Sequence, residues 1–211
     1  RHPRSHHAVK INPEHWLEGV THDEIAGGSA MAIRRCLVIH FTSGATAKSS
    51  INFWRTPAAK GASAHIVIDR DGTIYQCRPF NRTCGHAGTS RWRDPKTGKL
   101  YIGVNTCGIG IELANAGNDP ALASRWTKLP LVSSGHRNSP KTIERWEAFP
   151  AAQLAACTRV ALAVVTRYQL DDITGHDCIA PERKNDPGPA FPMTELRKAC
   201  GFTGQPAVHR V

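Results

Sequence analysis

Two histidines and one aspartate stand where an α/β domain exposes chemically active side chains. His40 lies near the end of the apolar run 36–41, and His176 and Asp186 lie toward the two ends of the segment 175–189. Strand ends and the loops that follow them are where such folds gather catalytic groups. Two imidazoles and one carboxylate give zinc three protein ligands and leave a fourth position for water, which is typical of hydrolytic zinc sites.

Each of these residues also has an ordinary interpretation. A lone histidine in a strand is more often a hydrogen-bonded core residue than a ligand, and an aspartate before a proline, such as Asp186, is often a turn former. On spacing alone, the sequence favours these ordinary interpretations over a metal site.

Glu112 is the second chemical signal, because it interrupts the apolar run Ile109-Gly-Ile-Glu-Leu113. Burial of this carboxylate is unfavourable unless it has a partner or a task. Desolvation raises a carboxyl pKa toward the range that suits acid/base catalysis. A glutamate at a strand end that simply reaches water is the alternative.

Short apolar runs that alternate with helix-like segments predict an α/β domain. Strands are predicted at 36–41, 64–68, 73–77 and 109–113, and an Asp-Gly turn at 69–72 joins the middle two into a hairpin. Helices are predicted at 46–54, from residue 151 to about 168, and at 193–200. Thr46 is a plausible N-cap of the first helix, and the long second helix has one apolar side that should pack on the sheet.

The 211 residues suit a single domain. We place the domain at 31–200, after an N-terminal arm or extension at 1–30 and before a C-terminal tail at 201–211. Between 115 and 150 the periodicity fades, which predicts a long surface loop or insertion. No apolar run approaches the roughly 20 residues that cross a bilayer, and no signal peptide is visible. The stretch 1–7 is compatible with a cloning remnant and carries no functional weight.

Charge and cysteine content leave the partner and the compartment open. Lys and Arg outnumber Asp and Glu by 27 to 17, and the net charge of +10 predicts attraction to a polyanion. Nucleic acid, an anionic membrane and the carboxylate-rich bacterial wall all qualify, although the basic residues form no nucleic-acid signature. The seven cysteines contain no CxxC pair. Buried free thiols, with one or two disulfides at most, are favoured over a Cys nucleophile or a Cys-ligated zinc.

Five segments, taken in order, carry a resemblance to a known family. They are Val38-Ile-His-Phe-Thr42, Ser63-Ala-His-Ile-Val-Ile-Asp-Arg-Asp-Gly72, Gly85-His-Ala-Gly88, Ile109-Gly-Ile-Glu-Leu113 and the loop 175–191. Together they resemble the motifs of zinc-dependent N-acetylmuramoyl-L-alanine amidases, the type 2 amidases related to peptidoglycan recognition proteins. The resemblance covers about 35–191, and the last loop is especially similar to that of bacterial amidases that trim anhydro-muropeptides.

The resemblance implies a central mixed β-sheet flanked by helices in one domain. It implies a hydrolase that cleaves the amide bond between the lactyl group of N-acetylmuramic acid and the L-alanine of the peptidoglycan stem peptide. Its metal would be Zn²⁺, held by His40, His176 and Asp186. Peptidoglycan or a muropeptide is the expected substrate, and we expect a monomer with no nucleic acid and no membrane insertion. Wall lysis, remodelling and muropeptide recycling all stay open, and so does the compartment.

The remaining site residues also follow from the resemblance. Glu112 falls on the family's acid/base carboxylate, and Lys184 falls on the lysine that steadies the negative oxygen of a tetrahedral intermediate. His65 and His86 would line the substrate groove. The alternatives are that His65 points into the core and that His86 only forms a turn.

Other residues carry weaker expectations. Asn52, Arg70 and Arg78 are candidates to contact stem-peptide carboxylates, although a solvated arginine is the commoner outcome. His136 is expected on ordinary surface. We exclude Cys178 as a fourth metal ligand because it would close the site. The insertion at 115–150 either forms one wall of the groove or is an idle surface excursion.

Two other functions stay open at this point. A non-catalytic peptidoglycan-binding module on the same fold is one, but such relatives typically lack part of the metal set, which is complete here. A nucleic-acid-binding protein is the other, and only the net charge supports it.

Overall fold

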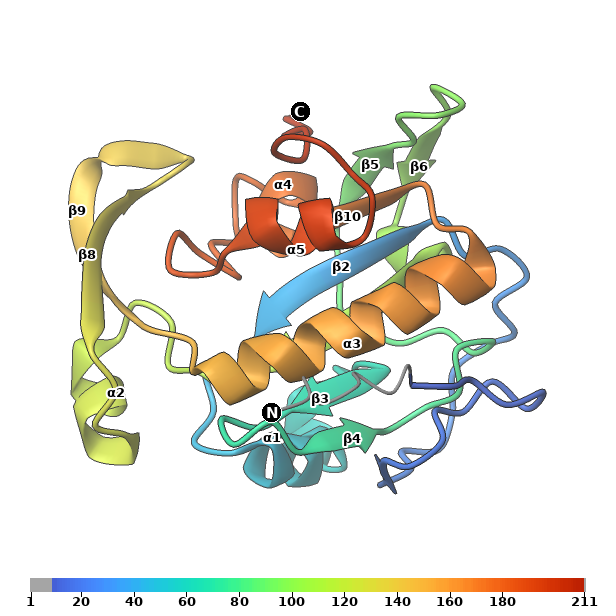
Figure 1. Cartoon of the computed structure of the whole chain (residues 1–211), viewed down its shortest axis with the longest axis horizontal. Helices are drawn as coiled ribbons and strands as arrows, with labels where there is room; N and C mark the ends of the chain where they lie inside the picture. Colours follow the sequence, from blue (N-terminus) through green and yellow to red (C-terminus); the bar gives the residue numbers. More distant parts are fainter. Residues whose placement is uncertain (1–8, 211) are drawn as a thin grey trace, which may run out of the picture.

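The computed structural model describes residues 9–210. The stretch 1–7, interpreted above as compatible with a cloning remnant, lies outside the described residues. The described chain folds around one six-stranded sheet with helices on its faces (Figure 1). The predicted α/β class and the mixed sheet flanked by helices are confirmed.

The sheet is mixed, with the order β1-β4-β3-β7-β2-β10. Only β3 and β4 are antiparallel to each other, and every other neighbouring pair is parallel. The inner strands β2 and β7 are almost completely buried, which explains their largely apolar sequences. The edge strand β10 is also buried. The strands are β1 (Thr21–His22), β2 (Cys36–Phe41), β3 (Ile66–Ile68), β4 (Ile74–Gln76), β7 (Gly108–Leu113) and β10 (Asp172–Gly175).

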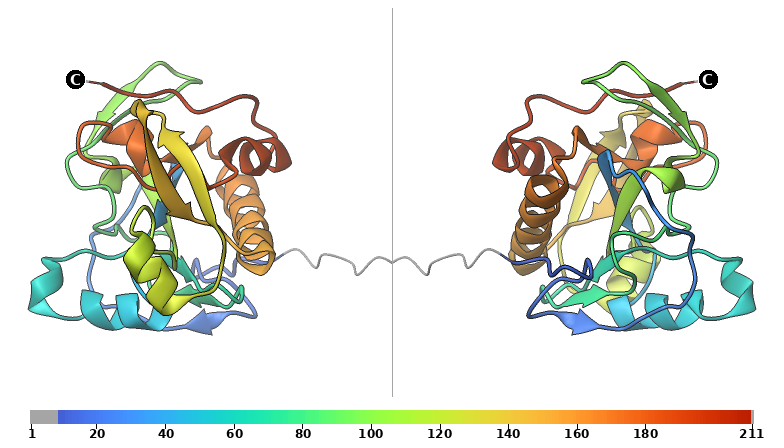
Figure 2. Two further views of the ribbon diagram at one scale, coloured as in Figure 1. Left: turned by 90° about the vertical axis from the view of Figure 1, so that its left-hand side faces the viewer. Right: turned by 90° about the vertical axis from the view of Figure 1, so that its right-hand side faces the viewer.

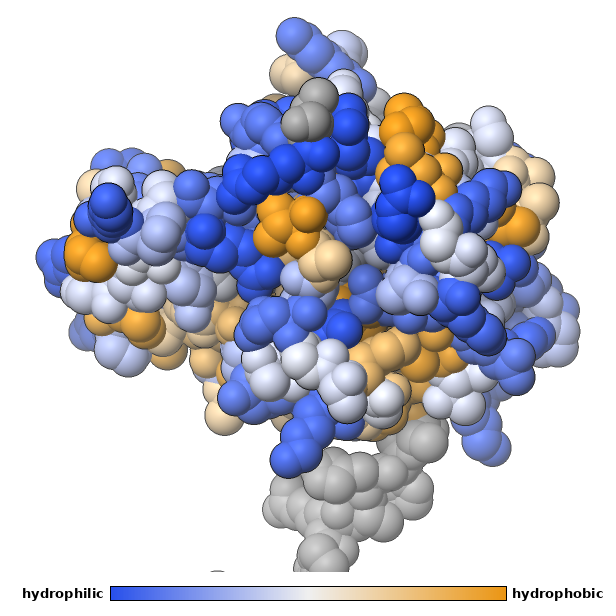
Figure 3. Space-filling view, turned by 90° about the horizontal axis from the view of Figure 1, so that it is seen from above, coloured by the Kyte–Doolittle hydropathy of each residue, from blue (hydrophilic) through white to orange (hydrophobic). Residues whose placement is uncertain are grey.

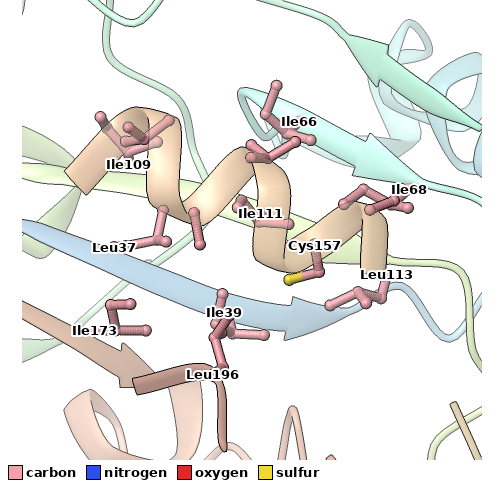
Figure 4. Close-up of a cluster of buried hydrophobic side chains, with 14 of the residues drawn as sticks. Leu37, Ile39, Ile66, Ile68, Ile109, Ile111, Leu113, Cys157, Ile173 and Leu196 are labelled. Atoms are coloured by element: carbon pink, nitrogen blue, oxygen red, sulfur yellow. The ribbon is translucent and has the colours of Figure 1, made fainter. Parts of the chain in front are cut away.

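The long helix α3 (Ala151–Tyr168) lies across one face of the sheet (Figures 1 and 2). Its buried side includes Ala156, Cys157, Val160 and Val164, which pack with α5 (Met193–Ala199) against alternate residues of β2, β3 and β7. Figure 4 shows these aliphatic side chains gathered around α3. Each fully buried Leu or Ile stabilises the fold by roughly 1.5 to 3 kcal/mol, so this layer is the main core.

The other face of the sheet carries shorter elements. Here α1 (Ala47–Trp54) begins with a capping box, in which the Thr46 hydroxyl accepts from the backbone N–H of Ser49 and the Ser49 hydroxyl accepts from that of Thr46. Two single turns, η1 (Pro57–Ala59) and η2 (Val104–Thr106), and a small hairpin, β5 (Arg91–Arg93) with β6 (Leu100–Ile102), complete this side. The predicted strands, hairpin and helices are confirmed, whereas no pattern predicted β5 and β6.

The segment 115–150, predicted as a long surface loop or insertion, contains secondary structure of its own. It contains α2 (Pro120–Trp126) and a hairpin of β8 (Leu131–His136) with β9 (Ser139–Glu147). This hairpin stands at one end of the molecule, outside the main sheet (Figure 1). Most of its residues are exposed, which is why no apolar alternation marked it in the sequence.

The segments outside the proposed limits 31–200 pack on the domain where the structure describes them. Leu17 is fully buried, and β1 pairs with β4, so the segment 9–30 packs against the domain. In the tail, the backbone N–H of His209 donates to the carbonyl of Cys178 at 2.8 Å. No helix within 9–210 combines the length and apolarity needed to span a bilayer. Seen from above, the surface is mainly hydrophilic with separate hydrophobic patches (Figure 3).

Candidate metal centre and active site

Three neighbouring parallel strands place their carboxyl ends at one edge of the sheet, and the site forms there. In the strand register, His40 on β2 faces Glu112 on β7, and Ile39 on β2 faces Gly175 at the end of β10. Because directly paired residues point to the same face of a sheet, the side chains of His40 and Glu112 emerge side by side. His176 follows at once as the first residue of α4 (His176–Ile179).

The loop after α4 returns to bring Asp186 beside both histidines. The loop is closed by a bond from the backbone N–H of Asp177 to the carbonyl of Asp186 at 2.8 Å. His40 Nδ1 lies 3.0 Å from His176 Nδ1 and 2.9 Å from Asp186 Oδ2, and His176 Nδ1 lies 3.0 Å from the same oxygen. All three side chains are buried. The structure therefore brings together the three residues that the sequence proposed as ligands.

Hydrogen bonds on the far sides of both imidazoles define which nitrogens carry protons. His176 Nε2 lies 3.1 Å from the carbonyl of Ala87, so this nitrogen is the donor. His86 Nε2 lies 3.0 Å from the carbonyl of Gly108, which leaves His86 Nδ1 to accept from His40 Nε2 at 3.0 Å. The Nδ1 atoms of His40 and His176 therefore point their lone pairs at Asp186.

The electrostatics agree with a neutral His40 and an ionised Asp186. Burial, reinforced by His176, lowers the pKa of His40 to about 4. Burial alone would raise the pKa of Asp186, but the two imidazoles override it and lower that pKa. Two nitrogen lone pairs and a carboxylate oxygen thus converge with no proton between them, an arrangement that a bound cation stabilises. This set can hold a metal ion.

A cavity of about 510 Å³ opens above this cluster. The pKa of Glu112 is raised well above its ordinary value, because the carboxyl is buried and Asp186 is near, while Lys184 acts in the opposite direction. Glu112 Oε2 has no hydrogen-bond partner, so it is available to a substrate or water. The lining includes Phe41, Thr42, Trp54, Ser63, His86, Glu112, His176, Arg183, Lys184, Asn185 and Asp186.

The two histidines predicted to line the groove have different positions. His86 is at the cavity and supports His40, and Gly110 leaves room for its ring, because a Cβ at Gly110 would lie 2.6 Å from His86 Cγ. His65 is fully buried and does not line the cavity. Its ring accepts from the N–H of Gly110 at 3.1 Å and donates to the carbonyl of Arg82 at 2.8 Å, so the core alternative describes it.

The weaker candidates do not face the cavity. Arg70 pairs with the buried carboxylate of Glu147 at 2.6 Å, and Arg78 donates to backbone carbonyls, among them that of Thr83 at 2.7 Å. Asn52 accepts from Arg55 on the exposed side of α1. All seven cysteines are free thiols, and Cys178 accepts from Arg137 at 2.8 Å rather than joining the metal cluster.

His136 is the residue that sequence reasoning placed wrongly. It is only 3% exposed, its Nε2 lies 3.0 Å from Asp177 Oδ2, and its ring stacks on Trp146. Its partner lies 41 positions away in the chain, and no local pattern reports such a contact. The only available signal was the adjacency of Asp177 to the candidate ligand His176.

With this geometry in place, comparison with known families is decisive. The sequence profile described as N-acetylmuramoyl-L-alanine amidase matches residues 30–189, which is most of the chain. This chain belongs to the N-acetylmuramoyl-L-alanine amidase family. The match includes all three candidate metal ligands, Glu112 and Lys184.

Individual amidases of this family show the same relationship. The N-acetylmuramoyl-L-alanine amidase AmiD of Escherichia coli (strain K12) is 30% identical over 186 residues, which cover 84% of this chain and 56% of AmiD. The 1,6-anhydro-N-acetylmuramyl-L-alanine amidase AmpD of Citrobacter freundii is 34% identical over 137 residues, which cover 64% of this chain and 55% of AmpD. The chain therefore spans little more than half the length of these curated relatives.

Solved amidase structures share the fold. AmiD from E. coli, in complex with anhydro-N-acetylmuramic acid-L-Ala-D-gamma-Glu-L-Lys, superposes with a TM-score of 0.61 at 26% identity and covers 86% of this chain and 62% of that one. A selenomethionine derivative of AmpD superposes with a TM-score of 0.60 at 28% identity, covering 88% of this chain and 97% of that one. The predicted amidase fold is thereby confirmed.

Proposed function

We propose that this protein is a zinc-dependent amidase that hydrolyses the bond between the lactyl group of N-acetylmuramic acid and the L-alanine of the peptidoglycan stem peptide. The observation that carries the proposal is the convergence of His40, His176 and Asp186 beside the buried carboxyl of Glu112, at the floor of a cavity. Family membership and the anhydro-muropeptide bound to the related AmiD support this substrate class.

The three side chains fit zinc by donor type and by spacing. Two neutral imidazole nitrogens and one carboxylate oxygen are common zinc donors, and a tetrahedral zinc with bonds of about 2.0 to 2.1 Å separates its ligands by about 3.3 Å. The donor atoms here lie 2.9 to 3.0 Å apart, so a shift of a few tenths of an ångström admits the ion. Zinc in this position would polarise a carbonyl and lower the pKa of a water molecule toward neutrality.

Glu112 has the position and the environment of the acid/base group. It accepts a proton from the attacking water and later delivers that proton to the leaving nitrogen of L-alanine. Lys184 lies on the cavity wall, where its ammonium group stabilises the negative oxygen of the tetrahedral intermediate. His86 keeps the ring of His40 in the orientation that presents Nδ1.

Product analysis tests the proposal directly. The purified protein, loaded with zinc, is incubated with intact sacculi and with soluble anhydro-muropeptides, and the products are analysed by mass spectrometry. We expect a new free amino terminus on L-alanine, loss of the reaction after exhaustive chelation, and recovery when zinc is restored. Cleavage at another bond, or full activity after chelation, would contradict the proposal.

A variant pair distinguishes the site from general damage. His176→Ala removes a proposed ligand and should abolish both stoichiometric zinc binding and cleavage. His22→Ala removes an exposed imidazole of β1, far along the sheet from β10, and should retain both. Equal loss in the two variants would show that the effect does not come from the metal site.

A further inference from the structure

The tip of the β8–β9 hairpin holds α4, the element that begins with His176. His136 Nδ1 accepts from the backbone N–H of Asn138 at 3.1 Å, so the ring proton is on Nε2, which donates to Asp177 Oδ2 at 3.0 Å. Both side chains are almost completely buried, at 4% and 3% exposure. A buried hydrogen bond to a carboxylate is stronger than a neutral one in water, so it fixes the residue next to His176 firmly.

Two more residues of the hairpin tip contact the same segment. The side-chain amide of Asn138 donates to the backbone carbonyls of Asp177 at 3.0 Å and of Pro181 at 3.4 Å. Arg137 Nε lies 3.3 Å from Asp177 Oδ2, and its guanidinium also donates to Cys178 Sγ at 2.8 Å. Side chains of the hairpin tip therefore contact both the side chains and the backbone of α4.

The same insertion also contacts the segment around the other ligand of this loop, Asp186. Trp146 of β9 packs against Gly188, where an added Cβ would lie only 2.6 Å from the indole ring. The side-chain amide of Asn185 donates to Asn118 Oδ1 at 3.1 Å. Trp146 in turn stacks on His136, with ring centroids 5.8 Å apart, so the two sets of contacts are connected.

We propose that the β8–β9 hairpin is a brace for the metal-binding loop, and that His136 is a positioning residue that orients His176 through Asp177. This inference rests on the proposed function, because it assigns the brace to a zinc site. A metal centre needs its ligands held within about 0.5 Å of their working geometry, and the loop 176–186 is long enough to require outside support. Partners that hydrogen-bond directly to a metal ligand typically change metal affinity or activity by about 10- to 100-fold when they are removed. His136 acts one residue further from the metal, so we expect the lower end of that range.

Two conservative variants separate the hydrogen bond from the mere presence of a side chain. In His136→Gln, the amide N–H reaches the place of Nε2 and keeps the bond to Asp177. In His136→Asn, the amide ends near the place of Nδ1 and loses that bond. Lys141→Ala is the matched control, because Lys141 is an exposed residue of β9 in the same hairpin.

The measurement is the zinc dissociation constant of the whole chain, obtained by competition with a chromophoric chelator. We expect His136→Asn to raise this constant by about tenfold or more, and His136→Gln and Lys141→Ala to stay within about threefold of the wild type. In an Asp177→Ala background, the difference between the asparagine and glutamine variants should vanish.

Three results would overturn the brace. The first is a zinc dissociation constant in His136→Asn equal to that of the wild type. The second is an equal rise of this constant in His136→Asn and His136→Gln. The third is a difference between these two variants that remains in the Asp177→Ala background. A wild-type protein that binds no zinc at all would refute the proposed function itself, so the two failures are distinguishable.

Discussion

Replacing Glu112 by glutamine is the most informative single change in the site. Glutamine has nearly the same shape as glutamate, but it cannot take up a proton from water at neutral pH. General acid/base groups contribute typically about 10²- to 10⁴-fold to a rate, which corresponds to about 2.7 to 5.4 kcal/mol of activation free energy. We therefore expect kcat of Glu112→Gln to fall within that range while the zinc content stays unchanged.

The same substitution should stabilise the metal-free protein, and the sign follows from the pKa of Glu112. This pKa is raised in the folded state, so the folded protein binds a proton more tightly than the unfolded chain. The free energy of unfolding therefore falls as the pH rises from the unfolded pKa through the folded one. Glutamine does not titrate, so at about pH 8 we expect metal-free Glu112→Gln to have a higher free energy of unfolding than metal-free wild type.

Both quantities can be measured on one preparation. Urea unfolding of metal-free wild type and Glu112→Gln should give a difference at about pH 8 that disappears below about pH 4, where both side chains are neutral. Glu18→Gln, at an exposed position, is the control and should change neither stability nor kcat. Wild-type kcat in Glu112→Gln would refute the catalytic role. A metal-free Glu112→Gln protein that is no more stable than metal-free wild type at about pH 8 would refute the reasoning about the pKa.

Three more predictions follow from the geometry. Lys184→Ala should lower kcat by about 10²- to 10³-fold with KM within about threefold of wild type, as steady-state kinetics on a soluble muropeptide would show; a change in KM alone would remove Lys184 from the chemical step. Gly110→Ala places a Cβ against the ring of His86 and should reduce the free energy of unfolding by about 1 to 3 kcal/mol and weaken zinc binding, measured by urea unfolding and chelator competition. Burial raises the pKa of the Cys157 thiol to about 12, so iodoacetamide at about pH 8 should leave it unmodified in the native protein and label it after unfolding; rapid native labelling, read by peptide mass spectrometry, would contradict its position in the core.

The sequence by itself determined the elements whose signals are local. The apolar run 36–41, which contains His40, needed only burial on both faces to form a central strand, and it became β2. Thr46 and the Asp-Gly turn at 69–72 act through hydrogen bonds to near neighbours, such as the bond from the N–H of Asp69 to the carbonyl of Thr73, so their outcomes were readable in advance. The candidate ligands were readable only through the resemblance to type 2 amidases, because spacing alone favoured the ordinary interpretation of each residue; the strand register then shows that they meet at one edge of the sheet.

Only the tertiary structure decided which polar side chains are buried and which groups they contact. The sequence pattern was compatible with His65 in the substrate groove or in the core. The packing of β7 and of the segment near Arg82 placed it in the core. His136 was expected on the surface because its own segment is polar, yet it is buried against Asp177, a residue of another element. The physical reason is that secondary structure depends on neighbours within a few positions, whereas burial and hydrogen-bond partners depend on segments that meet only after the whole chain has folded.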